Sequence, residues 1–249
     1  MNMEIKLNNW FEAYFKNQNY KVDLSDFKYS SDYKDFFDSI ITFSNLKKLE
    51  NKFKKAVEEC KSFEVAGEVY FWENYDSPNK RNILTKRLLD YFDTPNNWKN
   101  FIDIIKNISE KPTFDNFEKL KNACGQPLSE FRTPIIFLAF YDPLNYPMVD
   151  KHIANWWKNN KEKYTSWWED NKEKHKSENH PNFFQNKDGF IETHTESQRR
   201  QNWHAYLVWS KFCRKYSIII NDNWRARDVE KTVWEAQKYD ISLEVPTAL

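Results

Sequence analysis

Most apolar positions of this chain recur at the three- and four-residue spacing of a helix with one buried face. One such stripe follows the turn pair Ser77-Pro78, a typical helix start, and comprises Leu84, Leu88, Leu89 and Phe92. A second stripe is followed by Gly125, which has the position of a residue just beyond a helix C-terminus, and comprises Phe114, Phe117, Leu120 and Cys124. We therefore predict a helix at each place.

The C-terminal part shows the same spacing twice. One predicted helix runs into the apolar stretch 218–220, and its buried face comprises Tyr206, Trp209, Phe212, Cys213 and Tyr216. The last helix is predicted to start around Asn223 and to bury Val229, Val233 and Ala236.

The run from Pro134 to Phe140 is apolar on every side and is therefore expected to be buried. Periodicity alone does not separate helix from strand in so short a run. Thr133-Pro134 supplies an N-cap and a proline at the first helical position, which favours a helix, and Asp142-Pro143 predicts its end. An aromatic and proline-containing connector, 145–149, follows, and a new helix is expected to open at Asp150.

These elements predict an all-α chain in four parts. Residues 1–75 form an N-terminal helical part, 76–157 a helical core, 158–200 a charged insertion with a loop near 175–195, and 201–249 C-terminal helices that pack back on the core. Trp156-Trp157 and Trp167-Trp168 are adjacent pairs, and neighbouring residues of a helix point in different directions. At most one tryptophan of each pair is therefore expected in the core.

Composition excludes several classes of protein. The 249 residues include 38 Lys+Arg and 37 Asp+Glu, so the chain is not a polycation, and 18% aromatic residues indicate an ordered protein. Only three glycines occur, which excludes the Gly-rich loops that bind nucleotide phosphates. Three scattered cysteines, no signal peptide and no apolar run of about 20 residues predict a cytoplasmic protein without membrane contact.

The search for other chemistry finds little. His175, His180 and His194 lack the spacing of zinc ligands, so no metal site is predicted. No G-x-S-x-G motif or Cys/His nucleophile pattern is present. We expect no cofactor.

The most informative segment runs from Gly125 to Trp157, and it reads as a turn, a buried helix, a connector and the start of another helix. With Val149, Asp150, His152 and Ile153 it resembles the helix-hairpin-helix DNA glycosylases, in which a Val-Asp-x-His-type segment follows the hairpin and carries the catalytic aspartate. The resemblance covers roughly residues 80–157 and 200–240.

This resemblance implies roles for several residues. Asp150 matches the catalytic aspartate, and Phe131 lies at the position where bifunctional members carry a catalytic lysine. The run 225–234 is similar to the last helix of the archaeal 8-oxoguanine glycosylase branch, which maps the base pocket onto Glu230 and Trp234, one turn apart on one face. Phe131 is also assigned to the base pocket. The contacts with the DNA backbone then map onto Gln126, Ser129, Arg132, His152, Arg225 and Arg227.

The chain departs from the family pattern in two ways. Pro127 and Ser129 replace hairpin glycines, and Pro127 has no N–H to donate to a phosphate. The catalytic lysine is missing at Phe131, so no Schiff base with the sugar is expected. The resemblance therefore implies a monofunctional glycosylase, acting as a monomer on double-stranded DNA that contains a damaged base, with an oxidised purine as the favoured substrate.

The chemistry of such a reaction explains the residue types. Breaking an N-glycosidic bond builds positive charge on the sugar, which a fixed carboxylate such as Asp150 stabilises while it orients the attacking water. The base must first be flipped out of the duplex, and aromatic side chains offset part of that cost by stacking on it.

Other interpretations stay open. Asp150 directly before a helix also fits a simple N-cap. The cap and a catalytic role are compatible, but if capping is its only role, the chain is a catalytically inactive protein of the same fold that binds nucleic acid or protein. A third interpretation is an aromatic-rich helical scaffold in a protein complex. The stretch from Lys211 to Lys231 has six Lys/Arg and three Asp/Glu, which fits either a solvated helix face or a strip that contacts phosphates.

Overall fold

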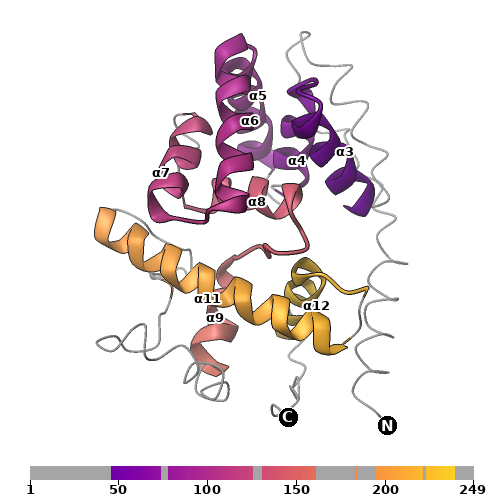
Figure 1. Ribbon diagram of the computed structural model, residues 1–249, viewed down its shortest axis with the longest axis vertical. Coiled ribbons are helices and arrows are strands. Elements are labelled where there is room, and N and C mark those ends of the chain that lie inside the picture. The colour runs from indigo at the N-terminus through magenta and orange to yellow at the C-terminus, as the bar shows by residue number, and fades with distance from the viewer. Residues whose placement is uncertain are drawn as a thin grey trace. The chain divides into compact units, whose positions relative to one another are not determined.

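The computed structural model describes residues 46–73, 78–125, 131–160, 183, 195–220 and 223–238 (Figure 1). The regular structure of these described residues is helical throughout, without a strand, which confirms the all-α prediction. The chain divides into two compact units between Asp142 and Pro143. We call the described residues up to Asp142 the N-terminal unit and those from Pro143 the C-terminal unit. The division falls earlier than residue 157, where the sequence-based division ended the helical core.

The N-terminal unit is built around one apolar helix. Its described helices are α3 (Leu46–Glu58), α4 (Glu64–Glu73), α5 (Pro78–Phe92), α6 (Pro95–Glu110), α7 (Phe114–Ala123) and α8 (Arg132–Tyr141). Helix α8 contacts α3, α4, α6 and α7, and its residues from Ile135 to Phe140 are at most 2% exposed. Because neighbours cover it on several sides, this helix is apolar all round, as predicted for the run 134–140.

Aromatic rings fill the space around α8. The ring of Phe137 lies 5.7 Å from that of Phe53 on α3 and 5.2 Å from that of Phe101 on α6. Phe101 in turn lies 5.0 Å from Phe92 of α5. Each buried phenylalanine stabilises the fold by roughly 1.5–3 kcal/mol relative to an exposed one. The aromatic side chains around α8 therefore form the hydrophobic core of the N-terminal unit.

The predicted helix ends of this unit hold with one exception. Helix α5 begins at Pro78 as expected, and α7 is followed by Gly125 with φ of +79°, a conformation that favours glycine. A Cβ at Gly125 would lie 2.9 Å from Cγ of Tyr91, so the ring also requires the absence of a side chain. The exception is α8, which begins at Arg132, so Thr133 is a buried residue of the first turn and not the predicted N-cap.

The C-terminal unit has three described helices: α9 (Lys151–Asn160), α11 (Glu196–Ile220) and α12 (Ala226–Lys238). Helix α12 contacts both α9 and α11. It begins three residues after Asn223, and Val229 and Val233 are buried as predicted, whereas the side chain of Ala236 lies outside the described ones. None of the described helices combines the length and apolar character that a membrane crossing requires.

The prediction for the first tryptophan pair was wrong. Trp156 and Trp157 are 5% and 2% exposed, and both rings lie within 6 Å of the rings of Trp209 and Phe212 on α11. Indole side chains are large, so those of two adjacent residues can both contact the same neighbouring helix even though they point in different directions. Trp167 and Trp168 lie outside the described residues.

Both ends of the predicted insertion belong to helices of the C-terminal unit, since α9 extends to Asn160 and α11 begins at Glu196. Between them, the described residues include Phe183, which is 5% exposed. The predicted loop near 175–195 lies almost wholly outside the described residues, as do residues 1–45 of the predicted N-terminal part.

Candidate active site

Asp150 ends the connector and caps α9. Its Oδ1 accepts the backbone N–H of Ile153 at 2.9 Å, and its carbonyl oxygen accepts the N–H of Ala154 at 2.9 Å. A carboxylate in this position pairs an otherwise unsatisfied N–H of the first turn and is stabilised by the positive end of the helix dipole. The predicted helix start at Asp150 is therefore confirmed, with the residue as its N-cap.

The second oxygen of Asp150 is bound by a residue that is distant in the sequence. Oδ2 accepts the indole Nε1–H of Trp234 on α12 at 2.7 Å. The ring of His152 lies 5.8 Å from that of Trp234, edge to face. All three side chains are half-buried. The carboxylate is thus oriented by two hydrogen bonds, one to each oxygen, in a residue that is not fully buried.

The connector before Asp150 is held by side chains of α11 and α12. Tyr206 donates its hydroxyl to the carbonyl oxygen of Pro147 at 2.9 Å, and the indole N–H of Trp209 donates to the carbonyl oxygen of Met148 at 3.0 Å. The N–H of Met148 donates to Oε2 of Glu230 at 3.2 Å. A buried connector has no helix or sheet to pair its backbone groups, so these side chains supply the partners that burial requires.

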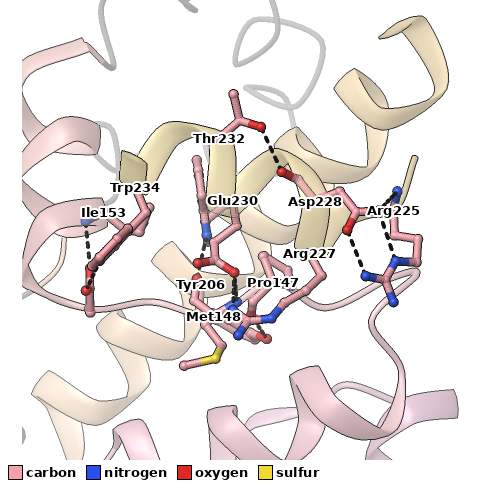
Figure 2. A network of polar contacts seen from close by, with 12 residues as sticks. Pro147, Met148, Ile153, Tyr206, Arg225, Arg227, Asp228, Glu230, Thr232 and Trp234 are labelled. Carbon is pink, nitrogen blue, oxygen red and sulfur yellow. Dashed lines mark hydrogen bonds and ion pairs between the residues drawn. The ribbon is translucent and has the colours of Figure 1, made fainter. Parts of the chain in front are cut away.

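Glu230 is a buried carboxylate with charged neighbours on its own helix. It is 5% exposed and forms an ion pair with the guanidinium of Arg227, itself 2% exposed (Figure 2). Burial raises the pKa of Glu230 above its ordinary value, while the charges of Arg227 and Lys231 and the N–H of Met148 oppose that rise. The charge of Asp150 adds to the rise in the pKa of Glu230.

Arg225 and Asp228 form the N-terminus of α12. The buried Asp228 accepts the backbone N–H of Arg225 at 3.0 Å and two hydrogen bonds from its guanidinium, at 2.9 and 2.7 Å. This is the acidic half of a capping box, in which a residue of the first turn reaches back to the N-cap N–H. The guanidinium of Arg225 is therefore used to hold the helix end, and its side chain is 17% exposed.

The structure brings together part of the predicted site. Asp150, His152, Glu230 and Trp234 lie around one connector, and Glu230 and Trp234 both reach it from α12, as expected for residues one turn apart. Arg227 does not fit its predicted role, because its guanidinium is buried beside Glu230 instead of being presented to a DNA phosphate.

The remaining predicted residues either belong to the N-terminal unit or lie outside the described residues. Phe131 and Arg132 belong to the N-terminal unit, where Phe131 is 1% exposed and its ring lies 4.9 Å from that of Phe117. Arg132 is half-buried. Gln126 and Ser129, in the predicted hairpin, lie outside the described residues.

Sequence reasoning missed the residues that hold the connector. It placed Tyr206 and Trp209 on the buried face of a helix, and both are buried, but their polar atoms bind residues about 60 positions away. A buried phenol hydroxyl or indole N–H requires a hydrogen-bond acceptor. The sequence therefore indicated that both side chains would bind an acceptor, but not which one. The i,i+3 spacing of Arg227 and Glu230 was a further signal for their ion pair.

The described residues contain no cluster of three or more His, Cys, Asp or Glu side chains with the geometry of a metal site. The cysteines are not bonded to each other: Cys60 is exposed, and Cys124 and Cys213 are buried. Burial raises the pKa of both buried thiols, so they remain protonated and poorly nucleophilic.

Comparison with known proteins found no matching family model, no matching curated protein and no matching solved structure.

Proposed function

We propose that this chain is a monofunctional DNA glycosylase that hydrolyses the N-glycosidic bond of a damaged base, with an oxidised purine as the favoured substrate. The observation that carries the proposal is the carboxylate of Asp150, which is half-buried and held by the N–H of Ile153 and the indole of Trp234. A fixed carboxylate of this kind stabilises positive charge without having to reorganise when that charge develops.

The proposed reaction needs only water as a second reactant. The bond between C1′ and the base breaks, positive charge builds on the sugar, a water oxygen adds to C1′, and the base leaves with a proton. Each oxygen of Asp150 accepts one hydrogen bond in the structure, and a carboxylate oxygen has two lone pairs. The carboxylate therefore keeps capacity to orient the water and to face the sugar.

Trp234 has two roles in this proposal. Its N–H orients Asp150, and the ring of the half-buried side chain stacks on the extruded base. Glu230 acts indirectly in this proposal: it accepts the N–H of Met148 and so helps to position Asp150, two residues later. Phe131 supplies no amine, so strand cleavage by β-elimination does not accompany base removal.

A cleavage panel tests the proposal. Labelled duplexes that carry 8-oxoguanine, uracil, hypoxanthine or an alkylated purine are incubated with the wild type and with Asp150→Asn, and half of each sample is then treated with hot alkali. We expect product from the wild type only after alkali, and a rate at least about a hundredfold lower for Asp150→Asn. Asp115→Asn, an exposed aspartate in the first turn of α7, is the matched control and should keep the full rate.

The same contacts favour a second candidate, a protein of this fold that binds nucleic acid or protein without chemistry. Both oxygens of Asp150 have structural partners, and Glu230 is engaged by Arg227 and by the N–H of Met148. Folded wild-type protein that binds duplex DNA but releases no base from any lesion would establish this second candidate. Strand breaks without alkali would contradict both, since they require an amine nucleophile.

A further inference from the structure

Helix α11 has an unusual charge pattern. From residue 197 to its end at Ile220 it contains no aspartate or glutamate, and its basic residues are Arg199, Arg200, Lys211, Arg214 and Lys215. The whole chain is nearly balanced, with 38 basic and 37 acidic residues. The excess of positive charge on α11 is therefore local, and acidic residues elsewhere in the chain compensate for it.

The structure divides the basic stretch from Lys211 to Lys231 into two halves. The three cations on α12 or at its start are turned inward: Arg225 binds Asp228, and Arg227 and Lys231 are 2% and 4% exposed. The three cations on α11 are turned outward, with Lys211 and Arg214 exposed and Lys215 half-buried. We call Lys211, Arg214 and Lys215 the basic face.

Several cations elsewhere in the described structure have an acidic partner one turn away. Lys54 pairs with Glu58 at 3.8 Å and Lys86 with Asp90 at 2.7 Å. At the start of α11 itself, Arg200 pairs with Glu196 at 3.0 Å. The basic face forms no ion pair with any residue that the structure describes, and α11 carries no acidic side chain from residue 197 to its end.

The basic face points away from the candidate active site. Tyr206 and Trp209 lie on the side of α11 that binds the connector, and Lys211 lies well over a quarter turn from both of them around the helix. Burial agrees with this, since Tyr206 and Trp209 are fully buried while Lys211 and Arg214 are exposed. A ligand on the basic face therefore does not occupy the position of the damaged base.

We propose that the basic face of α11 binds the sugar–phosphate backbone of duplex DNA outside the lesion and supplies sequence-independent affinity. The choice of duplex DNA as the polyanion rests on the proposed function. Positions i, i+3 and i+4 place the three charges on one side of the helix within about one turn, which suits a row of phosphates. The basic face would thereby replace phosphate contacts that Pro127, which has no N–H, does not provide in the hairpin that the sequence resemblance implies.

Salt dependence of binding tests the inference. An undamaged, fluorescein-labelled duplex is titrated with protein between about 50 and 200 mM salt, and binding is followed by anisotropy. Each phosphate contact contributes about 0.9 to the slope of log K against log salt. The triple variant Lys211→Gln/Arg214→Gln/Lys215→Gln should therefore lose about 2.7 from the slope, so wild-type affinity should fall about 40-fold more than variant affinity over this range.

A second triple variant, Lys54→Gln/Lys55→Gln/Lys86→Gln, removes the same charge from acid-paired positions of the N-terminal unit and is the matched control. It should keep the wild-type slope. Equal losses in both variants, an unchanged slope in the first, or no wild-type binding at the lowest salt would each overturn the inference. Wild-type binding to anionic lipid vesicles in place of DNA would overturn it as well.

Excision assays at saturating DNA separate this inference from the proposed function. If the first triple variant binds more weakly but excises at the wild-type rate, both stand. If its slope falls while not even the wild type releases a base, the basic face stands and the glycosylase proposal fails. If excision depends on Asp150 but the slopes are equal, the glycosylase proposal stands and the basic face is refuted.

Discussion

Replacing Arg227 with methionine probes the buried charges that support the connector. The change removes a guanidinium that is 2% exposed and keeps most of the side-chain volume. Its partner, Glu230, is then left as a carboxylate that is 5% exposed and is bound by the N–H of Met148. Removing one partner of a buried ion pair costs about 3–5 kcal/mol, because the other charge stays desolvated. Lys231 remains nearby, so we expect a loss of about 3 kcal/mol in the free energy of unfolding near neutral pH.

The loss should depend on pH in a defined direction. Burial already holds the pKa of Glu230 above its ordinary value of 4.5, and removal of Arg227 raises the pKa further. A carboxyl group whose pKa is higher in the folded state adds stability below its unfolded pKa, and that stability is lost as the pH rises through the folded pKa. The variant should therefore be close to wild type near pH 4.5 and reach its full deficit only above the raised pKa.

Urea unfolding at about pH 5 and about pH 8, followed by tryptophan fluorescence and circular dichroism, measures both effects. Arg200→Met is the matched control, since it breaks a pair with Glu196 whose side chains are 58% and 67% exposed, and it should cost less than about 1 kcal/mol. Adding Glu230→Gln to Arg227→Met should recover part of the loss. The reasoning is refuted if the two arginine variants cost the same, or if the loss from Arg227→Met is equal at both pH values.

Three further substitutions test single contacts. Asp150→Ala should lower the free energy of unfolding by about 1 kcal/mol through loss of the α9 cap, whereas Asp150→Asn should retain most of the stability that the cap provides. Equal urea midpoints for the two variants would contradict the cap. Gly125→Ala should lower the free energy of unfolding by about 1 kcal/mol or more, because φ at this position is +79° and the new Cβ would lie 2.9 Å from Cγ of Tyr91. An unchanged urea midpoint would argue against this turn. Trp157→Ala should cost about 3–5 kcal/mol in thermal or urea unfolding, and a loss below about 1 kcal/mol would mean that the indole is not buried as described.

Local signals predicted most of the helices. The spacing of Leu84, Leu88 and Phe92 marked the buried face of α5, and Gly125 marked the end of α7. Such features depend on residues within one or two turns of each other, so they are visible in the sequence. The start of α8 was misplaced because tertiary packing around Thr133 outweighed its preference for a cap position.

The candidate site was predictable only in part. The position of Asp150 before a helix indicated its N-cap, which is a local hydrogen bond to Ile153. The indole N–H of Trp234 donates to Asp150, 84 positions away, and the N–H of Met148 donates to Glu230, 82 positions away. No local pattern specifies such partners, because they depend on which helix faces pack together.

The sequence by itself determined the all-helical class, the apolar faces and the local caps, since helical periodicity and first-turn hydrogen bonds are properties of neighbouring residues. Only the tertiary structure decided which cations of the stretch from Lys211 to Lys231 point inward and which point outward. It also decided that Trp156 and Trp157 are both buried. The physical reason is the same in each case: burial is set by the partner that covers a helix face, and that partner comes from a distant part of the chain.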